Sequence, residues 1–164
     1  KFSESSLQSF VNNFVYKVVF PVYLSSDYIK CGFERLRSYR LLNSLYSEQK
    51  IAQFKSNLVD SYGPIPVSAE NLINMRLLMV LCFELGLVSV VVGLDSSELA
   101  FNSSFKRGED LFKFLSTNSD VFGIVSYSFD QREHITLLKI KYNKFVNLDG
   151  GFFVEFVRSF NSFS

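Results

Sequence analysis

The stretch from Leu72 to Leu94 reads LINMRLLMVLCFELGLVSVVVGL, and it decides the fold. It is long and apolar, but Arg76, Glu84 and Gly86 interrupt it. A helix that crosses a membrane needs about 20 mostly apolar residues, and charges inside it are costly. The stretch therefore predicts a buried core helix followed by a buried strand, and it argues against a membrane span.

The helix in this stretch has recognisable start and stop signals. The hydroxyl of Ser68 can cap its first turn, and the helix is predicted to run to Leu85 and to end at Gly86. Residues 77–83 are apolar all round, which places the helix at the centre of the core. The β-branched residues of 88–92 then predict a short, buried strand.

Antiparallel strands are predicted downstream. Residues 95–97 (Asp-Ser-Ser) form a turn and 98–102 return the chain. The clearest hairpin has strands over 123–129 and 134–142 around a loop at 130–133. Apolar and lysine residues alternate in its second strand, which predicts one buried and one wet face.

Helices flank these strands. A short helix is predicted over 107–115 with Ser104 as its cap, and a last helix over 152–160 after a break at Gly150-Gly151.

The segment upstream of the central helix carries signals for three helices and one strand. Pro21 limits its strand to a sheet edge, and Gly63 followed by Pro64 is a strong helix stop. The predicted elements are a short helix over 5–15, a strand over 16–24, a helix over 33–45, and a helix capped by Ser47 that ends at 62.

Helices come first and antiparallel strands come later. This order predicts an α+β fold, with a helical N-terminal part packed on a small, mostly antiparallel sheet and with a C-terminal helix.

Composition excludes several classes of protein. The chain has 164 residues, of which 48% are hydrophobic and 20% charged, as in a globular domain. A net charge of +1 argues against strong autonomous DNA binding. Cys31 and Cys82 form no Cys-x-x-Cys pair, which fits a reducing cytoplasm. The chain begins with Lys1 and shows no signal peptide, so we expect a cytoplasmic fragment of a longer protein.

The motifs of common catalytic sites are missing from the sequence. It contains no Walker A loop, no G-x-G-x-x-G and no G-x-S-x-G. The single histidine, His134, is expected in a strand and has no partners at metal-ligand spacing. We therefore expect no catalytic residues, no cofactor and no metal in this chain. A small-molecule enzyme would require a deep pocket lined by titratable groups.

Two groups of basic residues leave a nucleic-acid-binding module open as an alternative. Those on the first long helix can equally form ion pairs, for example with Glu34, and those late in the chain can mark an exposed strand face. The two groups are Arg35, Arg37 and Arg40, and Lys139, Lys141 and Lys144.

Three runs of residues resemble the bacterial transcription-repair coupling factors. The family has, after its motor, an apolar strand, a polar turn, Asp-aromatic-Ile and a helix with Arg-Leu-x-x-Tyr-[Lys/Arg]. Residues 21–45 (PVYLSSDYIKCGFERLRSYRLLNSL) are similar to this run. Its last positions are matched by Arg35, Leu36, Tyr39 and Arg40.

The second run, NLVDSYGPIP over 57–66, resembles the family's Leu-x-Asp-Arg-Phe-Gly-x-x-Pro, although Ser61 replaces the arginine. The third, from Asn71 through Arg76 to Gly86, resembles a long helix that ends in Leu-Gly. The matching positions of the second run are Leu58, Asp60, Tyr62, Gly63 and Pro66.

The resemblance implies a role. The family consists of ATP-driven translocases of double-stranded DNA (superfamily-2, helicase-like) that dislodge stalled RNA polymerase and recruit nucleotide-excision repair. ATP and magnesium belong to the motor. Residues 16–164 would be the C-terminal domain, and 1–15 a possible tail of the preceding one. This domain is implied to be autoinhibitory, packing against an N-terminal module similar to the excision nuclease B subunit and masking the surface for the A subunit.

Overall fold

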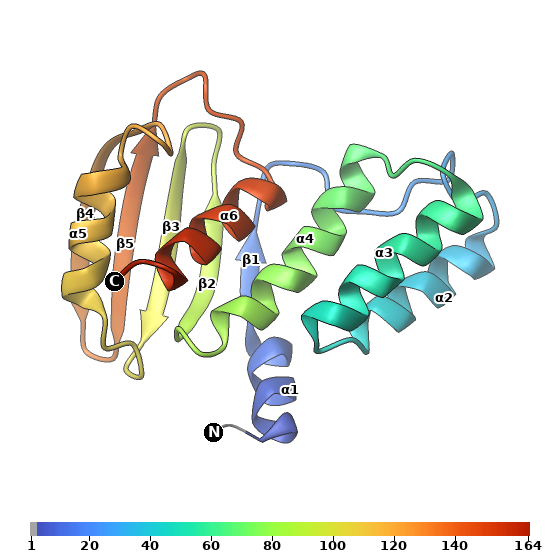
Figure 1. Cartoon of the computed structure of the whole chain (residues 1–164), viewed down its shortest axis with the longest axis horizontal. Helices are drawn as coiled ribbons and strands as arrows, with labels where there is room; N and C mark the ends of the chain where they lie inside the picture. Colours follow the sequence, from blue (N-terminus) through green and yellow to red (C-terminus); the bar gives the residue numbers. More distant parts are fainter. Residues whose placement is uncertain (1–2) are drawn as a thin grey trace.

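The computed structural model describes residues 3–164, which form two lobes that share one helix (Figure 1). A helical lobe contains α2 and α3, a sheet lobe contains most of the strands, and α4 lies between them. The elements are α1 (Glu4–Asn13), β1 (Val15–Lys17), α2 (Gly32–Asn43), α3 (Glu48–Tyr62), α4 (Val67–Cys82), β2 (Leu87–Val92), β3 (Ser96–Asn102), α5 (Gly108–Asn118), β4 (Ile124–Arg132), β5 (Ile135–Tyr142) and α6 (Gly150–Asn161).

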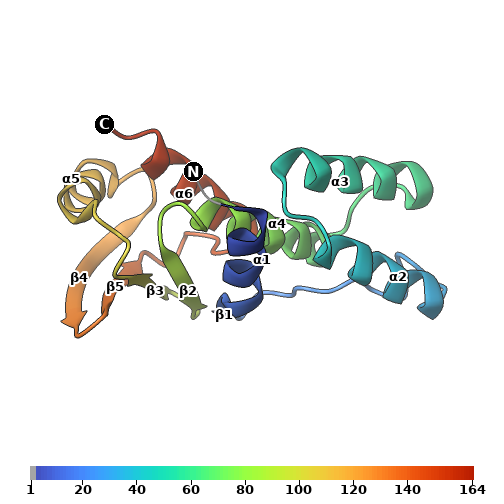
Figure 2. The ribbon, with the colours of Figure 1, turned by 90° about the horizontal axis from the view of Figure 1, so that it is seen from below.

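The sheet has the strand order β1-β2-β3-β5-β4. All neighbouring strands are antiparallel except β1, which pairs in parallel with β2 at one edge. Helices α4, α5 and α6 lie on one side of the sheet (Figure 2). The predicted α+β class, with a mostly antiparallel sheet and a C-terminal helix, is confirmed.

The alternation in β5 is confirmed as well. Leu138, Ile140 and Tyr142 are buried, whereas Lys139 and Lys141 are exposed on the face without helices. The helices thus cover one face, because only that face carries a continuous apolar layer.

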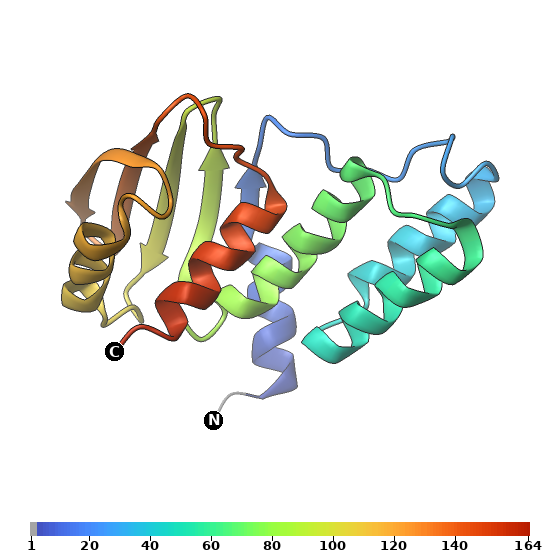
Figure 3. The same cartoon turned by 45° about the horizontal axis from the view of Figure 1, so that its top comes forward.

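The prediction that the central helix occupies the core is confirmed, because α4 supplies side chains to both lobes. Leu78 and Cys82 pack in the core of the sheet lobe, and Ala69 and Ile73 in that of the helical lobe. Helix α6 runs beside α4 (Figure 3). Gly150 allows this approach, since a Cβ there would lie 2.9 Å from the Cβ of Asn74.

Helix α4 has different ends from those predicted. It begins at Val67 with Pro66 as its N-cap residue, because proline fixes a backbone angle that suits a helix start. Ser68 is not the cap but is buried, and its carbonyl accepts a hydrogen bond from the N–H of Tyr23 (3.3 Å). The helix ends at Cys82 rather than Leu85, and Gly86 follows with φ of +77°.

The predicted strand over 16–24 is wrong beyond Lys17. Two side chains bond the backbone of this segment where a strand partner was expected. The amide of Asn71 donates to the carbonyl of Pro21 (3.1 Å), and the N–H of Leu24 donates to the hydroxyl of Tyr39 (2.7 Å). These bonds offer the backbone an alternative to a sheet ladder.

The hairpin is longer than predicted. Its strands meet at a two-residue turn, Glu133-His134, so 130–132 belong to β4 and His134 lies in the turn. Asp130 and Arg132 form an ion pair (3.1 Å) along the exposed edge strand, where charged side chains are tolerated.

Two predicted helix starts are also wrong. Arg107, not Ser104, precedes α5, and the Ser104 hydroxyl bonds the side chain of Asn102 (2.5 Å) instead. Gly150 and Gly151 do not break the chain before α6 but form its first turn, capped by Asp149.

Two N-terminal predictions fared better. Ser47 caps α3 as expected, because its hydroxyl accepts from the N–H of Lys50 (3.2 Å). Helix α1 begins one residue before the predicted range of 5–15 and ends two residues before the end of that range, and its Phe10 packs on Phe83 with ring centroids 5.2 Å apart. Residues 1 and 2 lie outside the described part, and the assignment of 1–15 to a preceding domain stays a prediction.

Candidate docking surface

The residues of the three family-like runs divide into two sets. Some hold the helical lobe together, and others lie exposed on it. The first set consists of Arg35, Tyr39, Leu58, Gly63, Pro66 and Arg76, and the second of Leu36, Arg40, Asp60 and, half-packed, Tyr62.

Arg76 is a buried clamp on the connection between α2 and α3. Its Nε donates to the carbonyl of Leu45 (2.9 Å) and its Nη2 to the carbonyl of Asn43 (2.7 Å). The guanidinium also stacks on Tyr46, 4.7 Å from the ring centroid. Arg76 therefore ties the end of α2 to α4, and its role is structural.

Tyr39 and Arg35 fasten the loop that precedes α2. The Tyr39 hydroxyl accepts from the N–H of Leu24, and Nη1 of Arg35 donates to the carbonyls of Ile29 (2.6 Å) and Lys30 (3.0 Å). Two of the four motif positions on α2 are thus explained by the fold alone.

Tyr28 performs a similar task at the end of α3, and sequence reasoning did not single it out. Its hydroxyl donates to the carbonyls of Leu58 (3.2 Å) and Gly63 (2.9 Å), and its ring packs edge-on against Tyr62. Burial, and secondarily Tyr62, raises the pKa of Tyr28. Gly63 has φ of +87°, which favours glycine at this helix end. Tyr28 is the aromatic residue of the Asp-aromatic-Ile motif, and this position could have identified it from the sequence.

The second set belongs to a surface made by the outer sides of α2 and α3. Phe33 is 77% and Leu36 46% exposed, so α2 presents apolar side chains to solvent next to charged ones. A shallow groove of 200 Å³ runs between the two helices. We call the exposed sides of these two helices the α2–α3 surface. It comprises the groove residues Arg37, Leu41, Asn57, Ser61 and Tyr62 and, outside the groove, the exposed residues Phe33, Leu36, Arg40 and Asp60.

Charged residues of this surface are left unpaired by the fold. Within residues 3–164, the side chains of Arg37, Arg40 and Asp60 form no hydrogen bond or ion pair. The ion pair considered for Glu34 is not formed either. Residues that match a family motif but serve no contact within the domain are available for a contact outside it.

The structure does not bring the two basic groups together. Helix α2 and strand β5 lie in different lobes (Figure 1). Lys139 lies 3.9 Å from Glu98, and the ammonium of Lys144 lies over the ring of Phe145. A continuous basic stripe, as expected for a nucleic-acid site, is not formed by these residues.

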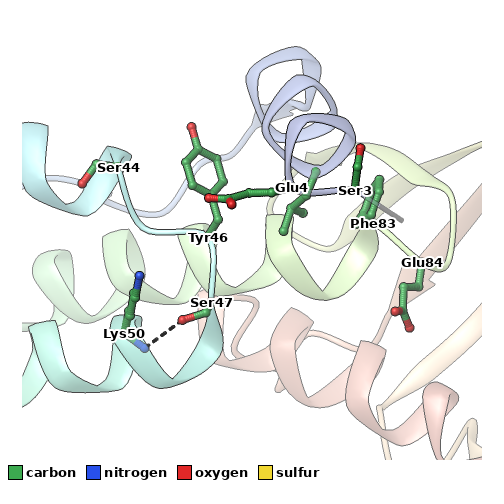
Figure 4. Close-up of a pocket in the computed structure, with 9 residues that line it drawn as sticks. Ser3, Glu4, Ser44, Tyr46, Ser47, Lys50, Phe83 and Glu84 are labelled. Atoms are coloured by element: carbon green, nitrogen blue, oxygen red, sulfur yellow. Dashed lines mark hydrogen bonds between the residues drawn. The ribbon is translucent and has the colours of Figure 1, made fainter. Parts of the chain in front are cut away.

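A hollow lies between α1, the α2–α3 connection and the end of α4 (Figure 4). It measures 680 Å³, and its charged residues are Glu4, Lys50 and Glu84. Its hydroxyls serve the backbone: Ser44 donates to the carbonyl of Leu41, and Ser47 caps α3. The hollow offers no nucleophile paired with a base among the described residues.

Metal and thiol chemistry is equally unsupported by residues 3–164. They contain no cluster of three or more His, Cys, Asp or Glu side chains that could hold a metal ion. Burial raises the pKa of the Cys82 thiol, and Cys31 is exposed. His134 is exposed in the β4–β5 turn. In the same part of the chain, no helix has the length and apolar character needed to cross a membrane.

Comparisons with known proteins point to one family. The model of the TRCF domain matches residues 18–111, more than half of the chain. The transcription-repair-coupling factor of Rickettsia typhi is 25% identical over 115 residues, which are 70% of this chain and 10% of that protein. That of Rickettsia conorii is 27% identical over 103 residues, 60% of this chain and 9% of that protein.

A solved structure gives the same answer for the fold. The crystal structure of a C-terminal domain of transcription-repair coupling factor aligns with a TM-score of 0.69 at 15% identity, and covers 90% of this chain and 94% of that one. The chain thus spans about a tenth of the length of the curated relatives and nearly all of this solved domain.

Proposed function

Because this chain belongs to the TRCF domain family, we propose that it is the non-catalytic, regulatory C-terminal module of a transcription-repair coupling factor. In this proposal it docks on the N-terminal module of the same protein, the one similar to the excision nuclease B subunit. Docking masks the surface for the A subunit and restrains the motor until RNA polymerase is engaged. ATP, magnesium and DNA are handled by that motor.

The α2–α3 surface carries the proposal. Leu36, Arg40 and Asp60 match family motifs, yet they are exposed, and their side chains form no hydrogen bond or ion pair within residues 3–164. By contrast Tyr39 and Arg76, from the same motifs, are explained by hydrogen bonds inside the helical lobe. A contact with another module would explain why residues at these motif positions are exposed.

The surface also suits a contact that must be released. It combines apolar side chains such as Phe33 and Leu41 with charges of both signs, Arg40 and Asp60. Such a mixed patch binds modestly, and tethering within one chain compensates by a high effective concentration. A competing partner can then shift the population to the open state.

Two substitutions in the full-length parent test the proposal. Arg40→Glu together with Asp60→Arg reverses both unpaired charges, and we expect higher ATPase activity and tighter binding of the excision nuclease A subunit. Lys141→Glu, on the exposed face of β5, is the control. Unchanged ATPase and A-subunit binding in a folded double variant would exclude docking through this surface, and deleting residues 16–164 would then report on docking by any face.

The nucleic-acid-binding alternative makes a different prediction. If Arg37 and Arg40 contact phosphates, the isolated chain shifts duplex DNA in a salt-dependent way, and each lost contact reduces the salt slope by about one. The separation of these arginines from Lys139 and Lys141 favours the protein-docking function.

A further inference from the structure

Strand β4 forms one edge of the sheet, and within residues 3–164 nothing pairs with its outer side. It is nine residues long, whereas β1 at the opposite edge has three. Long edge strands are usually blunted by lysine, proline or charge, because their free N–H and C=O groups attract other strands. Residues 124–129, IVSYSF, contain no charge and no proline.

Apolar side chains flank this free edge. Phe112 of α5 is 55% exposed, and Val125 is 65% exposed. Phe112 packs edge-on against Tyr127, which in turn packs against Phe129, with ring centroids 6.0 and 6.3 Å apart. A groove of 560 Å³ between α5 and β4 continues this row of rings. An uncovered strand bordered by exposed aromatic rings is a site for strand addition.

We propose that two copies of this chain associate through antiparallel pairing of their β4 strands, about a two-fold axis through Ser128. In this register Tyr127 of each copy lies opposite Phe129 of the other, which forms two aromatic cross-strand pairs on the helix-covered side. The α5 helices, with Phe112, then lie next to each other above the joined sheet.

The charge pattern favours a second copy as the occupant of this edge. When two identical strands pair about a two-fold axis, a charged residue near the axis lies close to the same residue of the other copy. Self-pairing therefore requires uncharged residues near the axis. The first charges along β4 are Asp130 and Arg132, which pair with each other (3.1 Å). In the register centred on Ser128, Asp130 faces Ser126 of the second copy and meets no like charge. Arg132 lies farther from the axis, where the β-bulge between Ile124 and Ser126 ends the regular pairing.

The expected association is weak. The area that one strand and its groove can bury is small compared with that of a typical specific interface, which is about 800 Å² per partner. The helical lobe, with the α2–α3 surface, contributes nothing to this contact, so dimerisation and docking can be tested separately.

Analytical ultracentrifugation of the isolated chain over a wide concentration range tests the proposal. We expect the average mass to rise from monomer towards dimer, and Phe112→Asp to abolish the rise. Phe145→Asp changes a more exposed phenylalanine (85%) outside the groove and should leave the rise intact. A wild-type chain that stays monomeric throughout, or one that both variants affect equally, overturns the proposal.

A disulfide provides a geometric test. In a Cys31→Ser background, Ser128→Cys places two thiols on the axis, where opposed residues have Cα atoms about 4.5 to 5.5 Å apart, within disulfide range. Mild oxidation should yield a covalent dimer, whereas Ser56→Cys on exposed α3 should not. Equal cross-linking of both variants would mean random collision, and no cross-linking of Ser128→Cys would exclude this register.

Discussion

The two lobes are stabilised in different ways. In the sheet lobe, phenylalanine rings pack on one another: Phe114 contacts Phe122, Phe156 and Phe160 with centroids 5.4 to 5.9 Å apart. The helical lobe has a smaller apolar core, and side chains reach out to loop carbonyls and N–H groups instead. Non-directional burial holds the sheet lobe, and directional hydrogen bonds hold the helical lobe.

This difference bears on function. Hydrogen bonds from side chains to the backbone fix the positions of α2 and α3, so the lobe needs few buried apolar residues. Apolar side chains such as Phe33 and Leu36 can therefore lie on its surface. The sheet lobe, in contrast, packs most of its phenylalanine rings in its own core and exposes Phe112, Phe129 and Phe145 at its surface. The proposed docking surface therefore lies on the lobe with the smaller apolar core.

The largest effect is expected in the aromatic core. Phe114→Ala removes a ring that is fully buried among other rings, and should lower the free energy of unfolding by about 3–5 kcal/mol. Urea denaturation measures this, with Phe145→Ala as an exposed control expected within about 0.5 kcal/mol of wild type. A loss below about 1 kcal/mol would mean that the ring cluster does not dominate this lobe.

The clamp of the helical lobe should matter nearly as much but more locally. Arg76→Met leaves the carbonyls of Asn43 and Leu45 without their donor, and should cost about 2–4 kcal/mol. Amide hydrogen exchange should accelerate in α2 and α3 while β3 and β5 stay protected. Arg76→Lys keeps the charge but not the two-nitrogen fork, and should recover part of the loss. Uniform acceleration in both lobes would show that they unfold as one unit.

Alkaline pH should weaken the sheet lobe first. Burial holds the Cys82 thiol and the Tyr142 hydroxyl protonated in the folded state, whereas in the unfolded chain they ionise near their ordinary pKa values of 9.0 and 10.0. Stability is therefore full below pH 9 and falls above it, by up to about 1.4 kcal/mol per pH unit for each group. Cys82→Ala should flatten the fall between pH 9 and 10 in urea titrations; an unchanged slope would assign it to another group.

The smallest effect is expected at the loop before α2. Tyr39→Phe removes the hydroxyl that accepts a hydrogen bond from the N–H of Leu24. Because this hydrogen bond is only partly buried, we expect a loss of about 1 kcal/mol. Hydrogen exchange at the Leu24 amide should rise with little change elsewhere. A global loss of several kcal/mol would instead place Tyr39 among the core residues of its lobe.

Periodicity was enough to predict most elements. Residues 77–83 are apolar all round, and this placed α4 at the centre; the alternation around Lys139 and Lys141 predicted which face of β5 is wet. These predictions succeeded because hydrophobic burial follows side-chain spacing along one element. The segment 18–24 failed the same test, since its apolar residues looked like a strand but its backbone is bonded by Asn71 and Tyr39.

The candidate surface could be predicted only in part. The motif positions Arg35, Leu36, Tyr39 and Arg40 were recognisable in the sequence. Their spacing could not separate Tyr39, which bonds Leu24 across 15 positions, from Arg40, whose side chain bonds no other described residue. The two basic groups looked equally available in the sequence, and the fold placed them in different lobes.

By itself, then, the sequence determined the α+β class, the central helix, the antiparallel hairpin and the family, because these depend on local spacing and on motif order. Only the tertiary structure decided that Arg76 and Tyr39 are clamps, that Leu36 and Asp60 are exposed, and that β4 has a free edge. The reason is that partners of a polar side chain and neighbours of a strand lie far away in the chain, and no local pattern records them.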